Sequence, residues 1–253
     1  MDFGIQGQTA IVTGGASGIG RAISEALGAC GVNVVLTYHT SEQGAVETVA
    51  AIEEAGAQAE AIQADLTREA EVERMVGRAV ERFGGVDLLV ANSGGLLRRS
   101  PVADCSLDLW NNALAVNLTS TFLSCRAVLP PMQRAGRGCI VAISSLAAHD
   151  GGGAGATHYA TAKGAVLTFT KALAKEVAPL GIRVNGVAPG LIGTQFHDQF
   201  STPEGRRAVV GRTPLGREGR PEDVAGAVLF LASPYASFLA GETIEVNGGQ
   251  GLF

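Results

Sequence analysis

No run of apolar residues in this 253-residue sequence approaches the roughly 18 that a membrane-spanning helix needs. The first ten residues, MDFGIQGQTA, lack the basic and apolar regions of a secretory signal, so we expect none. The formal net charge is -5, and the arginines are dispersed rather than gathered in a basic stripe. The sequence therefore predicts neither a membrane protein nor a nucleic-acid-binding protein.

The four cysteines and four histidines also lack the spacing of a metal site. Cys30, Cys105, Cys125 and Cys139 form no Cys-x-x-Cys pair, which predicts reduced, mostly buried thiols. The histidines, at positions 39, 149, 158 and 197, show no metal-ligand spacing either. We therefore predict a cytoplasmic protein without a metal site.

Short β-branched runs alternate with longer helical runs along the chain. The pattern predicts strands at 9–14, 33–38, 59–65, 87–92, 138–145, 182–189 and 242–248, and helices at 20–31, 41–56, 68–83, 106–134, 157–179 and 221–232. Ser41 is a candidate N-cap. Nearly continuous apolar strands alternating with helices predict one α/β domain over residues 1–253. We expect a doubly wound, mostly parallel, seven-stranded sheet with helices on both faces. The irregular segment 190–220 is predicted to be a substrate-binding lid.

The stretch TAIVTGGASGIG places glycines at positions 14, 18 and 20 between the first strand and the first helix. Glycine permits φ > 0 and lets a pyrophosphate approach the backbone at a helix N-terminus. The spacing is one step from the dinucleotide-binding fingerprint, although a plain tight turn needs glycines too. Its place after the first strand of an alternating chain favours the dinucleotide site.

Two further strand ends carry candidate ligand-binding residues. Asp65 ends the third predicted strand, where its carboxylate could bind an adenine amino group or cap the helix near 68. The sequence VANSGG (90–95) ends the fourth strand in small residues, which suits a flat ligand or a plain turn. The residues alone leave both alternatives open at each place.

Tyr159 and Lys163 lie four residues apart, directly after the glycine-rich stretch HDGGGAGAT. If Tyr159 begins a helix, Lys163 lies one turn later on the same face. An ammonium beside a phenol favours the phenolate and makes the phenol a stronger acid. Two ordinary residues of an amphipathic helix have the same spacing, so this pair decides nothing alone.

Taken in order, these motifs resemble the short-chain dehydrogenase/reductase family over nearly the whole chain. TGGASGIG matches the family's Thr-Gly-x-x-x-Gly-x-Gly turn, and APGLIGT (188–194) matches its Pro-Gly-x-Ile-x-Thr segment. ANSG stands where the family usually has Asn-Asn-Ala-Gly, with Ala91 and Ser93 departing. AVNL contains the matching Asn117, and GRPEDVA and GETIEVNGG match the last helix and strand.

The resemblance implies NAD(P)-dependent hydride transfer between a nicotinamide and a carbonyl or secondary alcohol. Tyr159 would be the acid in reduction and the base in oxidation, aided by Lys163, with Ser145 bonded to the reacting oxygen. Asn117 would hold a water linking Lys163 to solvent. The implied cofactor-binding residues are Gly14, Ser17, Gly18, Ile19, Gly20, Tyr38, His39, Thr40, Ser41, Asp65, Leu66, Asn92, Ser93, Gly94, Tyr159, Lys163, Pro189, Gly190, Ile192 and Thr194.

The end of the second strand favours NADP(H) over NAD(H), although NAD(H) stays possible. The sequence LTYHTS lacks the Asp or Glu that would bind an NAD ribose and repel a 2′-phosphate. The hydroxyls of Thr40 and Ser41 can donate to phosphate. His39 stands where NADP-preferring relatives often have arginine, and a neutral imidazole is a poorer partner for an anion.

The loops suggest a polar substrate. Ser145 precedes Tyr159 by one residue more than is usual in the family. The glycine-rich loop and the segments SGGLLRR (93–99) and TQFH resemble those of reductases that act on uronate-derived keto-sugar acids. Arg98 or Arg99 could bind a substrate carboxylate bidentately, with His149 and His197 bonding its hydroxyls. Both arginines could equally be solvated surface residues.

Two other functions share this motif set. A 3-oxoacyl-carrier-protein reductase would need a basic docking surface, which the charge balance supports little. A non-catalytic cofactor-binding protein is disfavoured by the intact Asn117, Ser145, Tyr159 and Lys163. The family resemblance also implies a homo-oligomer, commonly a tetramer, with a small-molecule substrate.

Overall fold

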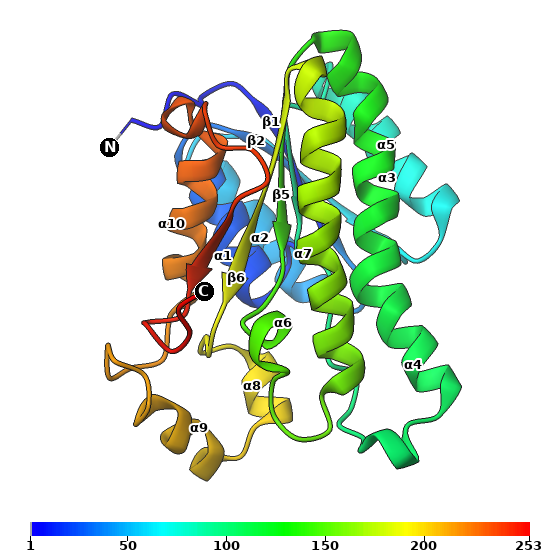
Figure 1. The fold of residues 1–253 in the computed structure, drawn as a ribbon. Coiled ribbons are helices and arrows are strands. Elements are labelled where there is room, and N and C mark those ends of the chain that lie inside the picture. Colours follow the sequence, from blue (N-terminus) through cyan, green and yellow to red (C-terminus); the bar gives the residue numbers. More distant parts are fainter. Residues whose placement is uncertain (1) are drawn as a thin grey trace.

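Seven parallel strands form one sheet in the computed structural model, which describes residues 2–253 apart from the side chains of residues 197–199. The strand order is β3-β2-β1-β4-β5-β6-β7. The chain therefore winds outward from β1 in one direction, returns to the centre after β3, and winds the other way (Figure 1). This is the predicted doubly wound fold, with its reversal between β1 and β4.

The strands start within one residue of their predicted positions and end up to two residues earlier. Small or polar residues follow most of them and turn the chain across the carboxyl edge of the sheet. The bounds are β1 Thr9–Val12, β2 Asn33–Tyr38, β3 Ala59–Gln63, β4 Leu88–Ala91, β5 Gly138–Ile143, β6 Ile182–Pro189 and β7 Thr243–Val246.

Helices cover both faces of the sheet, as expected. The bounds are α1 Gly18–Ala29, α2 Glu42–Glu54, α3 Glu69–Phe83, α4 Leu107–Leu114, α5 Ser120–Ala135, α6 Ala147–Asp150, α7 Thr157–Val177, α8 Gln195–Phe200, α9 Pro203–Val210 and α10 Pro221–Ala232. Short 3-10 turns lie at Val102–Asp104, Ala178–Leu180 and Pro234–Ala236. Helices α1, α2 and α10 pack on one face, and α3, α5 and α7 on the other (Figure 1).

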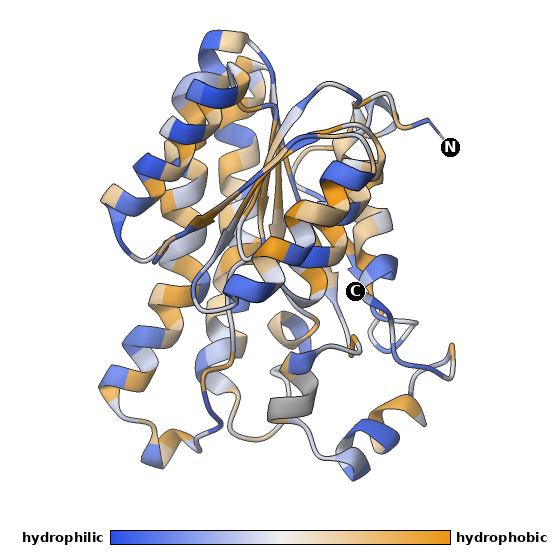
Figure 2. Ribbon diagram, turned by 180° about the vertical axis from the view of Figure 1, so that it is seen from behind, coloured by the Kyte–Doolittle hydropathy of each residue, from blue (hydrophilic) through white to orange (hydrophobic). Residues whose placement is uncertain are grey.

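Two apolar cores result, one on each side of the sheet. Successive side chains of a strand point to opposite faces, so Val12 of β1 joins the core under α1 while Ile11 joins the core under α3 and α5. Both are fully buried. Figure 2 shows the apolar strands at the centre, with hydrophilic residues on the outer faces of the helices. This burial fixes the sheet, and with it the edge where the site lies.

The helix predicted over 106–134 runs without a break over Leu107–Ala135, but it is not α-helical throughout. A π-helical turn, η2 (Ala115–Thr119), joins α4 to α5 and contains Asn117. Such turns insert an extra residue and often occur at functional sites. Ser41 occupies the predicted N-cap position of α2, but its side chain makes no capping hydrogen bond.

The combined helical stretch Leu107–Ala135 is long and apolar enough to cross a membrane when judged by length and composition alone. In the fold it contacts α3, α7, β4 and β5, and it contains Pro130 and Pro131. These contacts are those of a helix that covers a sheet, so its composition reflects core packing.

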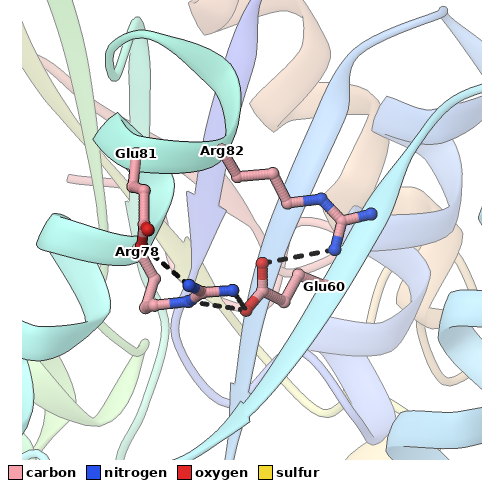
Figure 3. Close-up of polar contacts among 4 residues, drawn as sticks. All are labelled: Glu60, Arg78, Glu81 and Arg82. Atoms are coloured by element: carbon pink, nitrogen blue, oxygen red, sulfur yellow. Dashed lines mark hydrogen bonds and ion pairs between the residues drawn. The ribbon is translucent and has the colours of Figure 1, made fainter.

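The edge strand β3 is covered by a network of charges from α3 (Figure 3). The Glu60 carboxylate accepts from Arg78 Nη2 at 2.9 Å and from Arg82 Nη1 at 3.3 Å. Arg78 Nη1 also donates to Glu81 at 2.7 Å. Exposed ion pairs of this kind stabilise little, but charges at an edge strand oppose pairing with another chain.

Candidate active site

A cleft of about 1380 Å³ runs along the carboxyl edge of the sheet. Its walls come from the segments after β1 to β6, together with α7, α8 and α9. Ligands of open α/β sheets bind at this edge, where the winding reverses. All of the predicted cofactor-binding residues line the cleft, and so does Ser145.

The turn between β1 and α1 requires glycine for two reasons: its backbone conformation and the lack of room for a side chain. Gly14 and Gly18 have φ values of 64° and 51°, which glycine adopts readily. A Cβ at Gly20 would lie 2.1 Å from the carbonyl oxygen of Gly14. The turn therefore presents bare backbone beside the N-terminus of α1, where free N–H groups attract phosphate. These residues fit the pyrophosphate of a dinucleotide.

Asn92 holds this turn against β4. Its Nδ2 donates to the carbonyl oxygen of Thr13 at 2.9 Å. The main-chain N–H groups of Asn92 and Ser93 donate to Thr13 Oγ1 at 2.9 and 3.0 Å. The Asn92 side chain thus holds the glycine turn in place. Asn92 also lines the cleft, and its contact with the cofactor stays a prediction.

The ends of β2 and β3 form the far end of the cleft, where an adenosine would lie. Asp65 Oδ1 accepts from the main-chain N–H of Thr67 at 3.0 Å and from its hydroxyl at 2.7 Å. These bonds, followed by the nearby His39 and Arg68, hold the pKa of Asp65 below its usual value. The predicted capping role is replaced by this turn, because α3 begins only at Glu69. His39 and Thr40 are exposed at the cleft.

Ser145, Tyr159 and Lys163 meet at the middle of the cleft. Ser145 follows β5, whereas Tyr159 and Lys163 lie one turn apart near the start of α7, as the spacing predicts. The Ser145 side chain hydrogen-bonds that of Tyr159. Lys163 is buried, and its Nζ lies 5.9 Å from the centre of the Tyr159 ring. The three side chains bring a proton donor, a hydrogen-bonding hydroxyl and a cation together.

Burial controls the ionisation of both groups on α7. It raises the pKa of the Tyr159 hydroxyl, and the hydrogen bond with Ser145 opposes this in part. It lowers the pKa of Lys163 from 10.5 to about 8. We expected Lys163 to make the phenol more acidic, but in the protein alone desolvation of the phenolate outweighs that effect. Lys163 stays mostly protonated at neutral pH and supplies a cation to the site.

Asn117 lies behind the cleft wall rather than on it. Its Oδ1 accepts from Gly95 N at 3.0 Å, and its Nδ2 donates to the carbonyl oxygens of Gly95 and Ala113, both at 2.9 Å. A Cβ at Gly94 would lie 2.4 Å from Asn117 Oδ1 and 3.2 Å from Lys163 Nζ. The side chain therefore fixes the turn next to Lys163, and a water-holding role for Asn117 remains a prediction.

The segment after β6 closes the cofactor end of the cleft. Pro189, Gly190, Ile192 and Thr194 all line it. A Cβ at Gly18 would lie 3.5 Å from Thr194 Cγ2, so this segment lies against the glycine turn. The main chain on either side of Ile192 is hydrogen-bonded to the main chain of Gly219. These two bonds hold the segment in place.

The predicted substrate residues are not gathered at one place. Arg99 lines the cleft, but its Nε donates to the carbonyl oxygen of Phe200 at 3.0 Å and its Nη1 to that of Ala154 at 2.8 Å. Arg98 is exposed outside the cleft wall. The Arg99 guanidinium is thus bonded to the main chain on two sides, and carboxylate binding by either arginine stays a prediction.

Of the two histidines predicted to bond the hydroxyls of the substrate, only His149 has a described side chain. His149 is turned to the last strand, where its Nε2 lies 3.0 Å from Glu245 Oε1 and its ring stacks on Phe253 at 4.2 Å. It does not line the cleft. The side chain of His197 lies outside the described residues.

Several cleft residues were not predicted from the sequence: Leu96, Asp150, Phe196, Phe200, Arg206, Arg212 and Gln250. The spacing of Phe196 and Phe200 is a signal of one apolar helical face that could have identified their contribution. Nothing in the irregular sequence near Gln250 indicates that it turns toward the cleft.

A model of the family described as enoyl-(acyl carrier protein) reductase matches residues 14–250. The chain belongs to the short-chain dehydrogenase/reductase family. It is an NAD(P)-dependent oxidoreductase acting on hydroxyl or keto groups, as the sequence predicted. Ser145, Tyr159 and Lys163 lie within the matched range, and their catalytic roles stay a prediction.

Individual relatives of this short-chain dehydrogenase/reductase act on different compounds. It is 41% identical to 3beta-hydroxysteroid dehydrogenase 1 of Eggerthella lenta, over 98% of this chain and 95% of that protein. It is 39% identical to the 3-oxoacyl-[acyl-carrier-protein] reductase FabG of Vibrio cholerae, over 97% and 98%. The structure of the NADH-dependent reductase A1-R′, responsible for alginate metabolism, superposes with a TM-score of 0.90 at 29% identity, covering 99% of each chain.

Proposed function

We propose that this oxidoreductase reduces the carbonyl group of a small polar compound, such as a keto-sugar acid, and oxidises the corresponding alcohol. The observation that carries the proposal is the cluster of Ser145, Tyr159 and Lys163 on the cleft wall, between the glycine turn and the lid helices α8 and α9. A substrate held there contacts a proton donor and is covered by the lid segment, residues 190–220.

The residues around the glycine turn would hold a nicotinamide dinucleotide. The backbone near Gly14 to Gly20 would bind the pyrophosphate, Asp65 and Leu66 the adenine, and Ile192 and Thr194 the carboxamide. When bound, the cofactor supplies or accepts a hydride at the substrate carbon.

Tyr159 would donate a proton to the substrate oxygen during reduction and take it back during oxidation. The Ser145 hydroxyl is placed to bond the same oxygen and to orient it. Bringing a phenol from its usual pKa near 10 to neutrality takes about 4 kcal/mol of differential stabilisation. The buried ammonium of Lys163, 5.9 Å from the Tyr159 ring, favours the phenolate because little water screens the charge.

The substrate class is supported by the mixed character of the cleft lining. Asp150, Arg212 and Gln250 line the cleft together with Leu96 and Phe196. The similar fold of the reductase responsible for alginate metabolism is consistent with a sugar acid as the substrate of this protein. A 3-oxoacyl-carrier-protein reductase is the second candidate, since relatives with that activity match almost the full chain.

A substrate panel tests the proposal. Oxidation of NADPH and NADH would be followed with a keto-sugar acid, a hexose, a 3-oxosteroid and an acetoacetyl thioester. Preference for the sugar acid, with kcat/KM at least about tenfold above the others, supports the proposal. Preference for the thioester supports the carrier-protein alternative, and preference for the steroid rejects both.

We further propose that NADP(H) is the preferred cofactor. Tyr38, His39, Thr40 and Ser41 line the cleft after β2, and none of them carries a carboxylate. A 2′-phosphate would meet the hydroxyl groups of Thr40 and Ser41 there, and no carboxylate on residues 38–41.

A cytoplasmic homotetramer is also proposed. The exposed apolar side chains of Leu107 on α4 and Phe122 on α5 support association through these helices. Light scattering of the purified protein measures its mass, and a monomeric mass would contradict the proposal.

A further inference from the structure

We propose that Arg99 is the latch that holds the lid helix α8 closed over Tyr159, a positioning role that rests on the proposed function. Its guanidinium joins three segments: its own loop after β4, the glycine-rich loop at Ala154, and the end of α8 at Phe200. The bonds are Nε to the Phe200 carbonyl oxygen at 3.0 Å and Nη1 to the Ala154 carbonyl oxygen at 2.8 Å.

The backbone on both sides of Arg99 is fixed. His158 on α7 is buried and its Nε2 lies 3.0 Å from the carbonyl oxygen of Leu96. On the other side, the N–H of Ser100 donates to the carbonyl oxygen of Gly155 at 2.9 Å. Leu97 between them has a φ of 63°, a conformation that non-glycine residues hold only where their surroundings impose it. Arg99 therefore extends from a rigid base.

The glycines of the 151–155 loop make room for this side chain. A Cβ at Gly153 would lie 3.1 Å from Arg99 Nη1, and a Cβ at Gly155 would lie 3.1 Å from Arg99 Cβ and 2.9 Å from Ser100 N. Gly155 also has a φ of 74°. The glycine-rich sequence before Tyr159 thus brings its main chain close enough to accept the guanidinium.

Helix α8 connects the contact made by Arg99 to the reactive Tyr159. The carbonyl groups at the end of a helix lack partners within it, and arginine satisfies them well. At the other end of α8, the Phe196 ring lies 6.0 Å from the Tyr159 ring and 5.1 Å from the Phe200 ring. Fixing Phe200 therefore also restrains the Phe196 ring beside Tyr159.

Hydrogen–deuterium exchange of the full chain, with and without NADPH, tests the latch directly. In Arg99→Ala, amide exchange in the α8 peptide is expected to become about tenfold faster, while exchange in α1 stays unchanged. Arg99→Lys can reach one carbonyl at a time and is expected to give a smaller increase. Arg207→Ala is the control, because Arg207 is an exposed lid arginine whose side chain pairs with Glu204. Unchanged α8 exchange in a folded Arg99→Ala protein would overturn the latch.

Kinetics distinguish the latch from carboxylate binding. A latch variant raises KM for an acid substrate and for its uncharged analogue alike, by about tenfold, and leaves NADPH affinity unchanged. A KM increase for the acid alone would show that Arg99 binds the substrate and would overturn the latch. Because the exchange experiment needs no substrate, failure of the whole substrate panel would reject the proposed function and still leave the latch measurable.

Discussion

Lys163 donates from its buried ammonium to the main-chain carbonyl oxygen of Ile143, at 2.8 Å. Ile143 ends β5, two residues before Ser145. The lysine on α7 is thus tied to the strand that leads into Ser145, and Tyr159 lies near both Lys163 and Ser145. Changes to Lys163 are therefore expected to affect both stability and catalysis.

The lowered pKa of Lys163 predicts how stability depends on pH. The folded protein releases this proton near pH 8, whereas the unfolded chain keeps it to about pH 10.5. Between these values the unfolded chain binds more protons, so stability rises with pH. Between pH 8 and 10 we expect the free energy of unfolding of the wild type to rise, relative to that of Lys163→Met, by up to about 3 kcal/mol.

Urea unfolding of the two proteins at intervals from pH 7 to about pH 10 measures this difference. Tyr159 acts in the opposite sense above about pH 10, since burial raises its pKa and the folded protein keeps its proton longer. The series therefore stops there. Parallel stability curves for the two proteins would show that Lys163 is not desolvated in the fold.

Replacing Tyr159 by phenylalanine tests the proton donor. The ring and its contact with Phe196 remain, but the hydroxyl bonded to Ser145 is lost. We expect kcat to fall by about two to four orders of magnitude, with the melting temperature and NADPH affinity nearly unchanged. Turnover close to that of the wild type would remove Tyr159 from the proposed mechanism.

The fold and much of the cleft could be predicted because they follow from local pattern. Strand and helix periods determine the sheet, and the carboxyl ends of parallel strands meet at one edge, which brought Gly14, Asp65 and Ser145 together. The spacing of Tyr159 and Lys163 needs only the helical repeat.

The remaining site residues depend on contacts between distant segments. Which of Arg98 and Arg99 faces the cleft is decided by the backbone of Leu97 and by the bond from Ser100 to Gly155. His149 pairs with Glu245, which lies far along the chain, and therefore does not line the cleft. Sequence spacing carries no information about either contact.

The glycine turn gives a prediction with an internal control. Alanine at position 20 would place its Cβ 2.1 Å from the Gly14 carbonyl oxygen, whereas alanine at position 77 in α3 meets nothing within 4 Å. We expect Gly20→Ala to weaken NADPH binding by at least about a hundredfold. Gly77→Ala should bind normally and gain about 0.5–1 kcal/mol of stability, because alanine is the better helix former. Fluorescence titration and thermal unfolding measure both. Equal binding by the two variants would place the pyrophosphate elsewhere.

The last prediction concerns His39, which is exposed at the cleft after β2. An aspartate there would accept hydrogen bonds from an unmodified ribose and repel a 2′-phosphate. We expect the wild type to have the higher kcat/KM with NADPH, and His39→Asp to shift the ratio toward NADH by about tenfold or more. Because this position is remote from Ser145 and Tyr159 in the cleft, kcat with saturating NADH should change little. Steady-state kinetics with both cofactors decide the matter: a wild type that already favours NADH would contradict the proposed preference, and an unchanged ratio in the variant would show that position 39 does not contact the ribose.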